Sequence, residues 1–391
     1  MKRLLRISLD TLISSLMSIS IWIILSITVE KNLINIFTLT YPIQYLSCVL
    51  KSIFATGANI SKQKGNSNDV MSGILIGTIF SIVLFGILLF NLDLYLDFMN
   101  LYVDKSFVAY SIIQILLQTL LSFVLTKLYY EEKNVLANKY SITFYFLNFI
   151  CILITSLLYS QSNKIIVPTI TILLVYIIYI MAKSYQKFDF KFNLKNWIKY
   201  DAVELSNSIF LGLAYLFGLS TTVSYGESCA LALTFIALIT DTQWDISSSI
   251  STVAKIDISK NKFNYRTHIN NALKLATILI ISVLFMFGIL FHFYDLNLSI
   301  TLIFLSFHIV DFMLCPFYNV TTCYLQLEYS AIKTTSTNLS VRFIRLLLSF
   351  LRTPFCTVIA QVVSSICQVV SMSFIFSKRF RIGKSGNVEI K

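Results

Sequence analysis

Apolar runs long enough to cross a lipid bilayer follow one another along nearly the whole chain. A helix needs about 20 residues to cross the hydrocarbon layer of a membrane. Twelve such runs lie at residues 9–29, 33–57, 70–92, 107–128, 140–160, 164–182, 202–224, 228–253, 270–292, 297–325, 334–351 and 354–377. Because lipid offers no partners to backbone amides, such runs cross it as helices. The sequence therefore predicts an all-α polytopic membrane protein with about 12 transmembrane helices.

The composition argues against a soluble catalytic domain. Hydrophobic residues make up 56% of the 391 residues and charged residues only 13%, about half the charged share of a soluble domain. The apolar runs leave no stretch of about 100 residues for a further globular domain. The seven cysteines have no CxxC spacing and the three histidines form no ligand cluster. We therefore expect no enzymatic activity, no bound metal and no cofactor.

The basic residues are distributed unequally between the two sides of the predicted membrane protein. With 12 spans both termini lie on one side, and 23 of the 31 lysines and arginines fall in the loops and tails of that side. Only Lys31, Lys105, Lys164 and Arg352 fall on the other side. Basic loops stay in the cytoplasm, so both termini are predicted to be cytoplasmic, in the plasma or inner membrane. These orientation charges also account for the net charge of +12, and no nucleic-acid partner is expected.

A basic segment divides the chain near its middle. From Lys183 to Lys199 a lysine recurs at about every fourth residue, with aromatic residues between. This pattern predicts an amphipathic helix on the anionic inner leaflet, and a solvated linker is the alternative. The predicted domains are an N-terminal six-helix bundle at 1–183, a cytoplasmic linker at 184–200, and a C-terminal six-helix bundle with a short basic tail at 201–391.

The two halves resemble each other weakly. Ile60–Lys64 after the second span is similar to Ile258–Lys262 after the eighth, at an offset of 198 residues. Gly86–Leu88 in the third span matches Gly288–Leu290 in the ninth, at an offset of 202. Six spans per half give both halves the same orientation, which is a parallel pseudo-repeat. Chance similarity between apolar segments is the alternative.

Three segments resemble one transporter family. Pro42–Asp69 is similar to the second span and following loop of multidrug and toxic compound extrusion (MATE) transporters, where a proline-containing span leads to a small-residue patch and a basic loop. The matching residues are Ala55, Gly57, Ala58, Lys62, Gly65 and Asp69. Ala230–Lys262 resembles the equivalent place in the second half, and Asp311 with Leu325–Thr335 resembles the tenth span and its loop. The chain is identified as a divergent member of this family, within the multidrug/oligosaccharidyl-lipid/polysaccharide flippase (MOP) superfamily.

The resemblance implies a transport mechanism, but the first span of this chain departs from the family pattern. It implies two bundles around a central cavity, alternating access by rocking of the bundles, and H⁺ or Na⁺ as the coupling ion. The family often has an aspartate in the first span, but this chain has Trp22 near that place, and Asp10 lies too close to the cytoplasmic end. Coupling is therefore not expected in the first half, and a non-transporting relative is one alternative reading.

Three aspartates within spans are the candidates for cation coupling. An ionisable residue inside a span costs at least about 2.5–3.5 kcal/mol on insertion scales, so each needs an explanation. Asp241 and Asp311 each lie roughly 20 Å from the outer end of their spans at 1.5 Å per residue, so they share a depth. Asp245 lies one turn beyond Asp241, and two carboxylates so close would share a proton or a cation. Structural ion pairing is the alternative.

A second set of residues is a candidate for lining the substrate cavity. Arg342 and Arg345 are three residues apart on one face of the eleventh span, and arginine forks suit phosphate. They would fit the pyrophosphate of a lipid-linked sugar, or they pair with Asp311. Glu204 and Trp244 complete this set, with interfacial anchoring as the alternative for Glu204.

The predicted function is export of small cationic or lipophilic compounds by cation antiport. The alternative is a flippase for a lipid-linked oligosaccharide or polysaccharide precursor. A membrane-embedded enzyme is a third reading, without support from any Ser/His arrangement. The expected partners are the small-molecule or lipid-linked substrate and membrane lipid, and the chain is expected to act as a monomer.

The charge asymmetry makes the orientation testable. In a variant without native cysteines, one cysteine placed between residues 183 and 199 should resist a membrane-impermeant thiol reagent in intact cells and react after lysis. Gln161→Cys, beside Lys164 on the opposite side, should react in intact cells. Efficient labelling of the 183–199 cysteine from outside would reverse the orientation.

Overall fold

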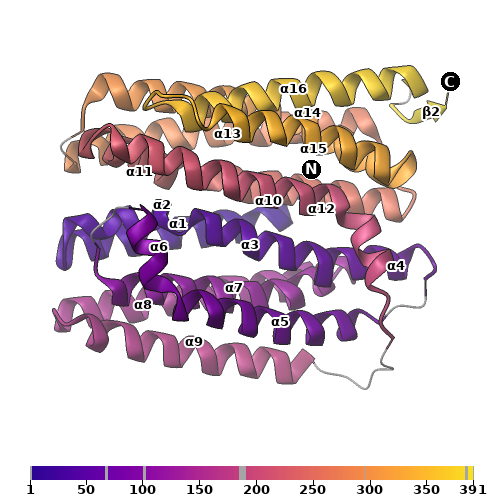
Figure 1. Cartoon of the computed structure of the whole chain (residues 1–391). Helices are drawn as coiled ribbons and strands as arrows, with labels where there is room; N and C mark the ends of the chain where they lie inside the picture. Colours follow the sequence, from indigo (N-terminus) through magenta and orange to yellow (C-terminus); the bar gives the residue numbers. More distant parts are fainter. Residues whose placement is uncertain are drawn as a thin grey trace. The chain divides into compact units, whose positions relative to one another are not determined.

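The structure is a computed structural model that describes residues 2–66, 69–99, 103–184, 191–294, 296–383 and 386–390 (Figure 1). These residues are almost entirely helical. Within them, nine helices are long and apolar enough to cross a membrane. The only strands in this described part are β1 (Phe380–Ile382) and β2 (Val388–Ile390), which pair antiparallel near the C terminus.

Each of the predicted spans coincides with a helical segment. In the first half these are α1 (Lys2–Thr28), then η1 (Lys31–Ile34), α2 (Asn35–Leu39), α3 (Tyr41–Lys51), the π-helix η2 (Ser52–Gly57) and α4 (Ala58–Gln63) as one interrupted span, followed by α5 (Val70–Phe90), the short α6 (Leu92–Met99), α7 (Lys105–Tyr130), α8 (Asn134–Leu158) and α9 (Ser162–Ser184). In the second half they are α10 (Leu194–Ser224), α11 (Glu227–Thr240), α12 (Thr242–Ser259), α13 (Tyr265–Leu290), η3 (Phe291–Phe293), α14 (Leu298–Glu328), α15 (Ala331–Leu348) and α16 (Cys356–Arg379).

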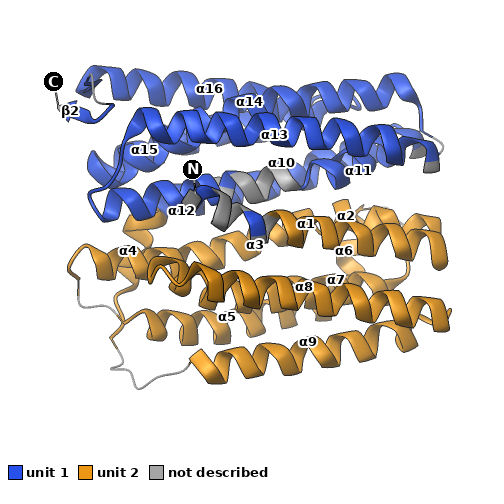
Figure 2. Cartoon of the chain, turned by 180° about the vertical axis from the view of Figure 1, so that it is seen from behind, with its two compact units in different colours: residues 1–11, 202–391 blue, residues 12–201 orange. Residues whose placement is uncertain are grey.

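The chain forms two compact units, coloured separately in Figure 2. One unit consists of residues 12–201, and the other of residues 1–11 and 202–391. We call them the first-half unit and the second-half unit.

Both units are built around the fourth span of their half. In the first-half unit α7 packs against α3, α5, α8 and α9, and α8 packs on α9. In the second-half unit α14 packs against α12, α13, α15 and α16, and α15 packs on α16. The same pairs of spans are therefore in contact in each unit, which confirms the predicted repeat of two six-helix bundles.

A pair of cross-helix hydrogen bonds fixes the offset of the repeat. Ser47 Oγ on α3 and Thr119 Oγ1 on α7 are 2.7 Å apart. Asn319 Nδ2 on α14 donates to Ser247 Oγ on α12 at 2.6 Å. Each pair is 72 residues apart, and the second pair stands 200 residues after the first. This offset lies between the 198 and 202 of the sequence repeat.

The end of the predicted linker is anchored inside the first-half unit. Residues 185–190 lie outside the described residues, and the helix that follows begins at Leu194. The Trp197 side chain is fully buried and its ring packs edge-on against Phe54. The segment is therefore helical from Leu194 onward, and Trp197, one of its aromatic residues, is packed against protein.

Two glycines make this anchoring possible. A Cβ on Gly57 would collide with the backbone carbonyl of Trp197. A Cβ on Gly73 of α5 would lie 2.5 Å from the backbone oxygen of Phe54 and 3.4 Å from the Trp197 ring. The absence of side chains at these positions lets three backbones approach closely, as at other membrane helix interfaces. Because the obstructing atoms belong to backbone, they cannot move aside easily.

Two glycines of α5 provide a matched test of this packing. Gly73→Ala should lower the free energy of unfolding by about 1–3 kcal/mol, because the added methyl overpacks a backbone contact. Gly86→Ala should leave it unchanged or raise it, since nothing lies within 4 Å of that position and alanine favours a helix by about 1 kcal/mol. The measurement is unfolding of both variants in detergent; equal stabilities would contradict the proposed packing.

Candidate functional site

A buried carboxylate lies in the interior of the second-half unit. Asp311 on α14 is 1% exposed, and its Oδ2 accepts a hydrogen bond of 2.7 Å from Gln361 Nε2 on α16. Pro316 follows on the same helix and has no N–H to give to the carbonyl one turn back. A carboxylate and a side-chain amide therefore meet at the α14–α16 contact, and α14 carries a proline a little more than one turn further on.

A chain of hydrogen bonds connects this carboxylate to an arginine. The Ser364 hydroxyl donates to the Gln361 carbonyl at 2.9 Å and accepts from Arg342 Nη1 at 3.4 Å. Arg342 Nη2 also donates to Gln368 Oε1 on α16. The Arg342 side chain is 2% exposed, so its charge is held among polar groups inside the bundle.

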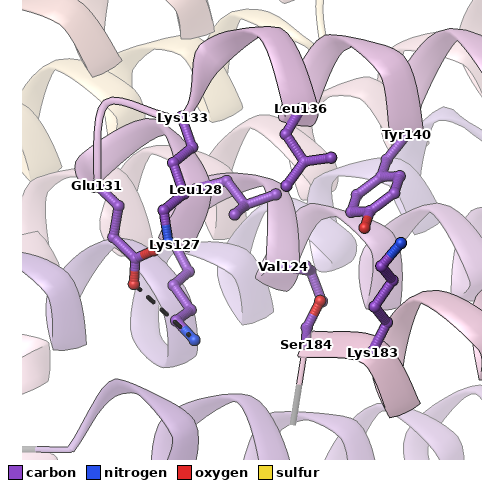
Figure 3. Close-up of a pocket in the computed structure, with 9 residues that line it drawn as sticks. All are labelled: Val124, Lys127, Leu128, Glu131, Lys133, Leu136, Tyr140, Lys183 and Ser184. Carbon is purple, nitrogen blue, oxygen red and sulfur yellow. Dashed lines mark hydrogen bonds and ion pairs between the residues drawn. The ribbon is translucent and has the colours of Figure 1, made fainter. Parts of the chain in front are cut away.

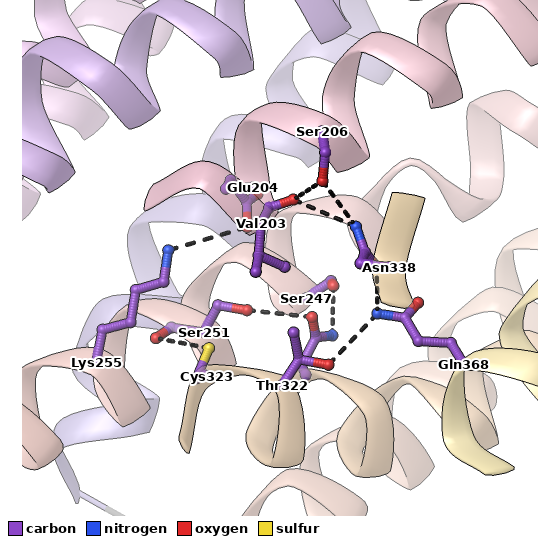
Figure 4. Close-up of polar contacts among 11 residues, drawn as sticks. Val203, Glu204, Ser206, Ser247, Ser251, Lys255, Thr322, Cys323, Asn338 and Gln368 are labelled. Carbon is purple, nitrogen blue, oxygen red and sulfur yellow. Dashed lines mark hydrogen bonds and ion pairs between the residues drawn. The ribbon is translucent and has the colours of Figure 1, made fainter. Parts of the chain in front are cut away.

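The same hydrogen-bond network extends from α16 to α10, and Figure 4 shows the contacts that connect them. Gln368 Nε2 donates to Asn338 Oδ1 at 3.1 Å and to Thr322 Oγ1 at 3.4 Å. Asn338 Nδ2 donates to Ser206 Oγ at 3.1 Å and to the Val203 carbonyl at 3.3 Å. Four helices, α10, α14, α15 and α16, are thus joined by one network of buried amides and hydroxyls.

A second polar face lies between α12 and α14. Besides the bond between Asn319 and Ser247, the Ser251 hydroxyl donates to Asn319 Oδ1 at 3.1 Å. The Cys323 thiol approaches the Ser251 carbonyl at 3.9 Å and is also 72 residues away from its partner. A constant offset of 72 residues means that α12 and α14 run parallel in a fixed register.

This register places two of the predicted coupling residues at one level. With an offset of 72 residues, Asp311 pairs with residue 239, which is two residues before Asp241. Two residues of a helix correspond to about 3 Å along its axis. Asp241 is half-buried and stands where α11 ends and α12 begins. The structure therefore breaks the predicted eighth span at Asp241, and the Asp311 carboxylate contacts α16.

The first-half unit carries no carboxylate at the equivalent positions. Shifted by 200 residues, Asp241 corresponds to Tyr41 and Asp311 to Ser111. Ser111 Oγ instead donates to Thr40 Oγ1 at 3.4 Å. A neutral hydroxyl contact therefore stands in the first half at the place where the second half has Asp311.

The other predicted site residues lie in different surroundings. The side chains of Trp244 and Asp245 lie outside the described residues. Arg345 is 3% exposed and close enough to His308, itself 6% exposed, to interact with it electrostatically. His308 precedes Asp311 by three residues on α14, so it lies on the same helix face.

Glu204 forms an ion pair that was not predicted from the sequence. Its carboxylate lies 4.0 Å from Lys255 Nζ, and the Lys255 side chain is only 4% exposed (Figure 4). Lys255 lies beyond the predicted eighth span at 228–253, but in the structure α12 continues past it to Ser259. Burial of the lysine within the helix bundle explains why it needs an acidic partner.

The amides that hold the network together were not among the predicted site residues. Gln361, Ser364 and Gln368 recur at intervals of three and four residues on α16. This spacing puts them on one helix face, so a signal was present in the sequence. The prediction missed it because it rested on charged residues within the spans.

Comparison with known proteins identifies the fold. The sequence matches no protein-family model and no curated protein. The chain is similar to the structure of a MOP superfamily transporter from Pyrococcus furiosus, with a TM-score of 0.68, 14% identity and 96% of each chain covered. The description of that transporter reports a binding pocket of reverse polarity that suggests a different function.

Two further structures give the same result. An outward-facing multidrug resistance MATE transporter has a TM-score of 0.67 and 14% identity, and 96% of each chain is covered. A MATE transporter of Vibrio cholerae has a TM-score of 0.67 and 13% identity, again over 96% of each chain. This protein therefore has the fold of MATE transporters of the MOP superfamily, as the sequence resemblance predicted.

The network predicts a stability effect with a matched control. Gln368→Leu removes the acceptor of Arg342 and a partner of Asn338, so we expect the free energy of unfolding to fall by about 2–3 kcal/mol. Ser373→Leu, exposed on the same helix, should change it by less than about 0.5 kcal/mol. The measurement is unfolding of both variants in detergent. Equal stability of the two would show that the network contributes nothing measurable.

Proposed function

We propose that this chain is a secondary active transporter that exports small cationic or lipophilic compounds in exchange for H⁺ or Na⁺. The observation that carries the proposal is the buried Asp311 at a helix–helix contact in a chain with the fold of transporters. A carboxylate inside a membrane protein costs free energy, and such residues usually have a function. Binding of a coupling cation is one function that would explain a carboxylate at this place.

The surroundings of Asp311 suggest how binding of a cation would act. The Gln361 amide donates a hydrogen bond to Asp311 Oδ2 and so occupies part of the carboxylate's acceptor capacity. A proton or Na⁺ at this carboxylate would compete with the amide for the same lone pairs. The α14–α16 contact would then rearrange around Gln361, whose backbone carbonyl accepts the Ser364 hydroxyl on the same helix.

Alternating access requires the cation to bind the two conformations differently. A ligand shifts a conformational equilibrium only by the difference in its affinity for the two states. In the proposed cycle, the cation stabilises one packing of α14 on α16, and export substrate stabilises the other. Asp241, between the end of α11 and the start of α12, is proposed to share the cation. Asp245, one turn beyond Asp241, is proposed to complete the acidic set.

The arginines favour export over the flippase alternative. Arg342 donates to Gln368 and Ser364 within the bundle, and Arg342 and Arg345 are 2% and 3% exposed. The Arg342 guanidinium, engaged in this way, serves the packing of α15 on α16. A pyrophosphate would have to displace these partners to reach it. We further propose that the chain works as a monomer in the cell membrane, with both termini in the cytoplasm.

Transport in proteoliposomes tests the acidic residues. Asp241→Asn, Asp245→Asn and Asp311→Asn should each reduce gradient-driven efflux of a fluorescent lipophilic cation at least tenfold, because asparagine cannot exchange a proton or neutralise Na⁺. Asp93→Asn is the control, since this exposed aspartate pairs with Lys105 at the surface. Imposing a pH gradient and a Na⁺ gradient separately identifies the coupling ion. Full efflux in all three variants would remove the carboxylates from the mechanism.

A double variant separates export from lipid flipping. Arg342→Gln with Arg345→Gln removes both charges and keeps hydrogen-bond donors, so drug resistance in an exporter-deficient host should be largely retained. A flippase depends on fixed positive charge, and this variant would then lose surface polysaccharide in the native host. That outcome, together with no resistance conferred by the parent protein, would favour the flippase.

A further inference from the structure

A cavity outside the proposed transport site lies in the first-half unit, between α7, α8 and α9 (Figure 3). Its volume is about 510 Å³, within the range of small-molecule sites. It is lined by Val124, Lys127, Leu128, Glu131, Lys133, Leu136, Tyr140, Lys183 and Ser184. The helix ends that form it belong to the side predicted to face the cytoplasm.

The polar part of this cavity is positively charged. Three lysines and one glutamate line it, which leaves two positive charges in excess. Glu131 lies 2.9 Å from Lys133 Nζ and 3.9 Å from Lys127 Nζ, and so holds both side chains at one edge. Figure 3 shows Lys183 and the Tyr140 hydroxyl at the other edge. Ammonium groups and hydroxyls from three helices converge in an arrangement that suits a phosphate group.

The cavity also borders an apolar surface. Leu136 lines it at 37% exposure, and the neighbouring Val135 is 77% exposed on α8. On α9, Val175 and Tyr179 are 62% and 54% exposed, and Lys183 donates to the Tyr179 hydroxyl at 3.3 Å. A tyrosine hydroxyl beside a lysine at the end of an apolar face is typical of the membrane interface. Such exposed apolar side chains would contact acyl chains in a bilayer.

We propose that this cavity binds the phosphate headgroup of an anionic phospholipid of the inner leaflet. Lys133 and Lys183 contact the phosphate from opposite edges, Tyr140 and Ser184 offer hydroxyls, and the acyl chains follow Leu136 and the apolar faces of α8 and α9. A soluble phosphate would use the charges but not the apolar border, and zwitterionic lipid would gain little from the excess charge. The site is separate from the proposed cation site.

Equilibrium binding to the full-length protein in neutral detergent tests the proposal. The probes are dioleoyl phosphatidylglycerol, dioleoyl phosphatidylcholine and inorganic phosphate, with bound lipid counted by native mass spectrometry. Phosphatidylglycerol should bind saturably and at least tenfold more tightly than phosphatidylcholine. Lys133→Gln with Lys183→Gln should weaken phosphatidylglycerol binding about 30-fold, at roughly fivefold for each lysine near an anionic headgroup.

The matched control removes two lysines from the other end of the same unit. Lys105→Gln with Lys164→Gln carries the same change of net charge and should leave phosphatidylglycerol binding unchanged. Leu136→Ser should weaken binding of the lipid but not that of inorganic phosphate. Equal affinity for the two lipids, or equal loss in both lysine pairs, overturns the proposal. Displacement of all bound phosphatidylglycerol by millimolar inorganic phosphate also overturns it and assigns the cavity to a soluble anion.

Discussion

The need to satisfy every backbone polar group without water determines the architecture of this chain. Lipid cannot replace the hydrogen bonds that water offers, so each span forms a helix and bonds to itself. Polar side chains then gain most where they face other helices, and the buried amides and hydroxyls of α14, α15 and α16 follow this rule. The association of membrane helices depends on close packing and such contacts more than on apolar burial. Gly57, Gly73 and the Asp311–Arg342 network are examples of the two kinds of contact.

Comparison of the two halves of the repeat distinguishes the contacts that both units share from the residues that only one unit has. The scaffold is the central fourth span and a hydroxyl or amide contact to the second span, present as Ser47–Thr119 and as Ser247–Asn319. The specialisation is the set of ionisable residues, and the three proposed coupling aspartates all belong to the second half. One half thus keeps neutral contacts at the places where the other carries acids.

The sequence predicted the fold well because lipid leaves a strong signal in hydropathy. All the spans and the repeat could be read from apolar runs and spacing. Helix interruptions were harder to predict: the π-helix at Ser52–Gly57 and the end of α11 at Thr240 both lie within runs that were read as single continuous spans. The burial of Lys255 and the role of Gln368 depend on which helices are neighbours. Tertiary contacts decide this, and a single sequence does not reveal them.

The offset of 200 residues gives the chain an uncharged counterpart of its own candidate site. Thr40 and Ser111 occupy in one bundle the positions that Thr240 and Asp311 occupy in the other. The repeat therefore contains its own comparison, with an acid at one of the two equivalent positions and a hydroxyl at the other. Any energetic difference between the two bundles can be measured within a single molecule, under identical lipid, temperature and ionic conditions. Few comparisons between separate proteins offer that degree of matching.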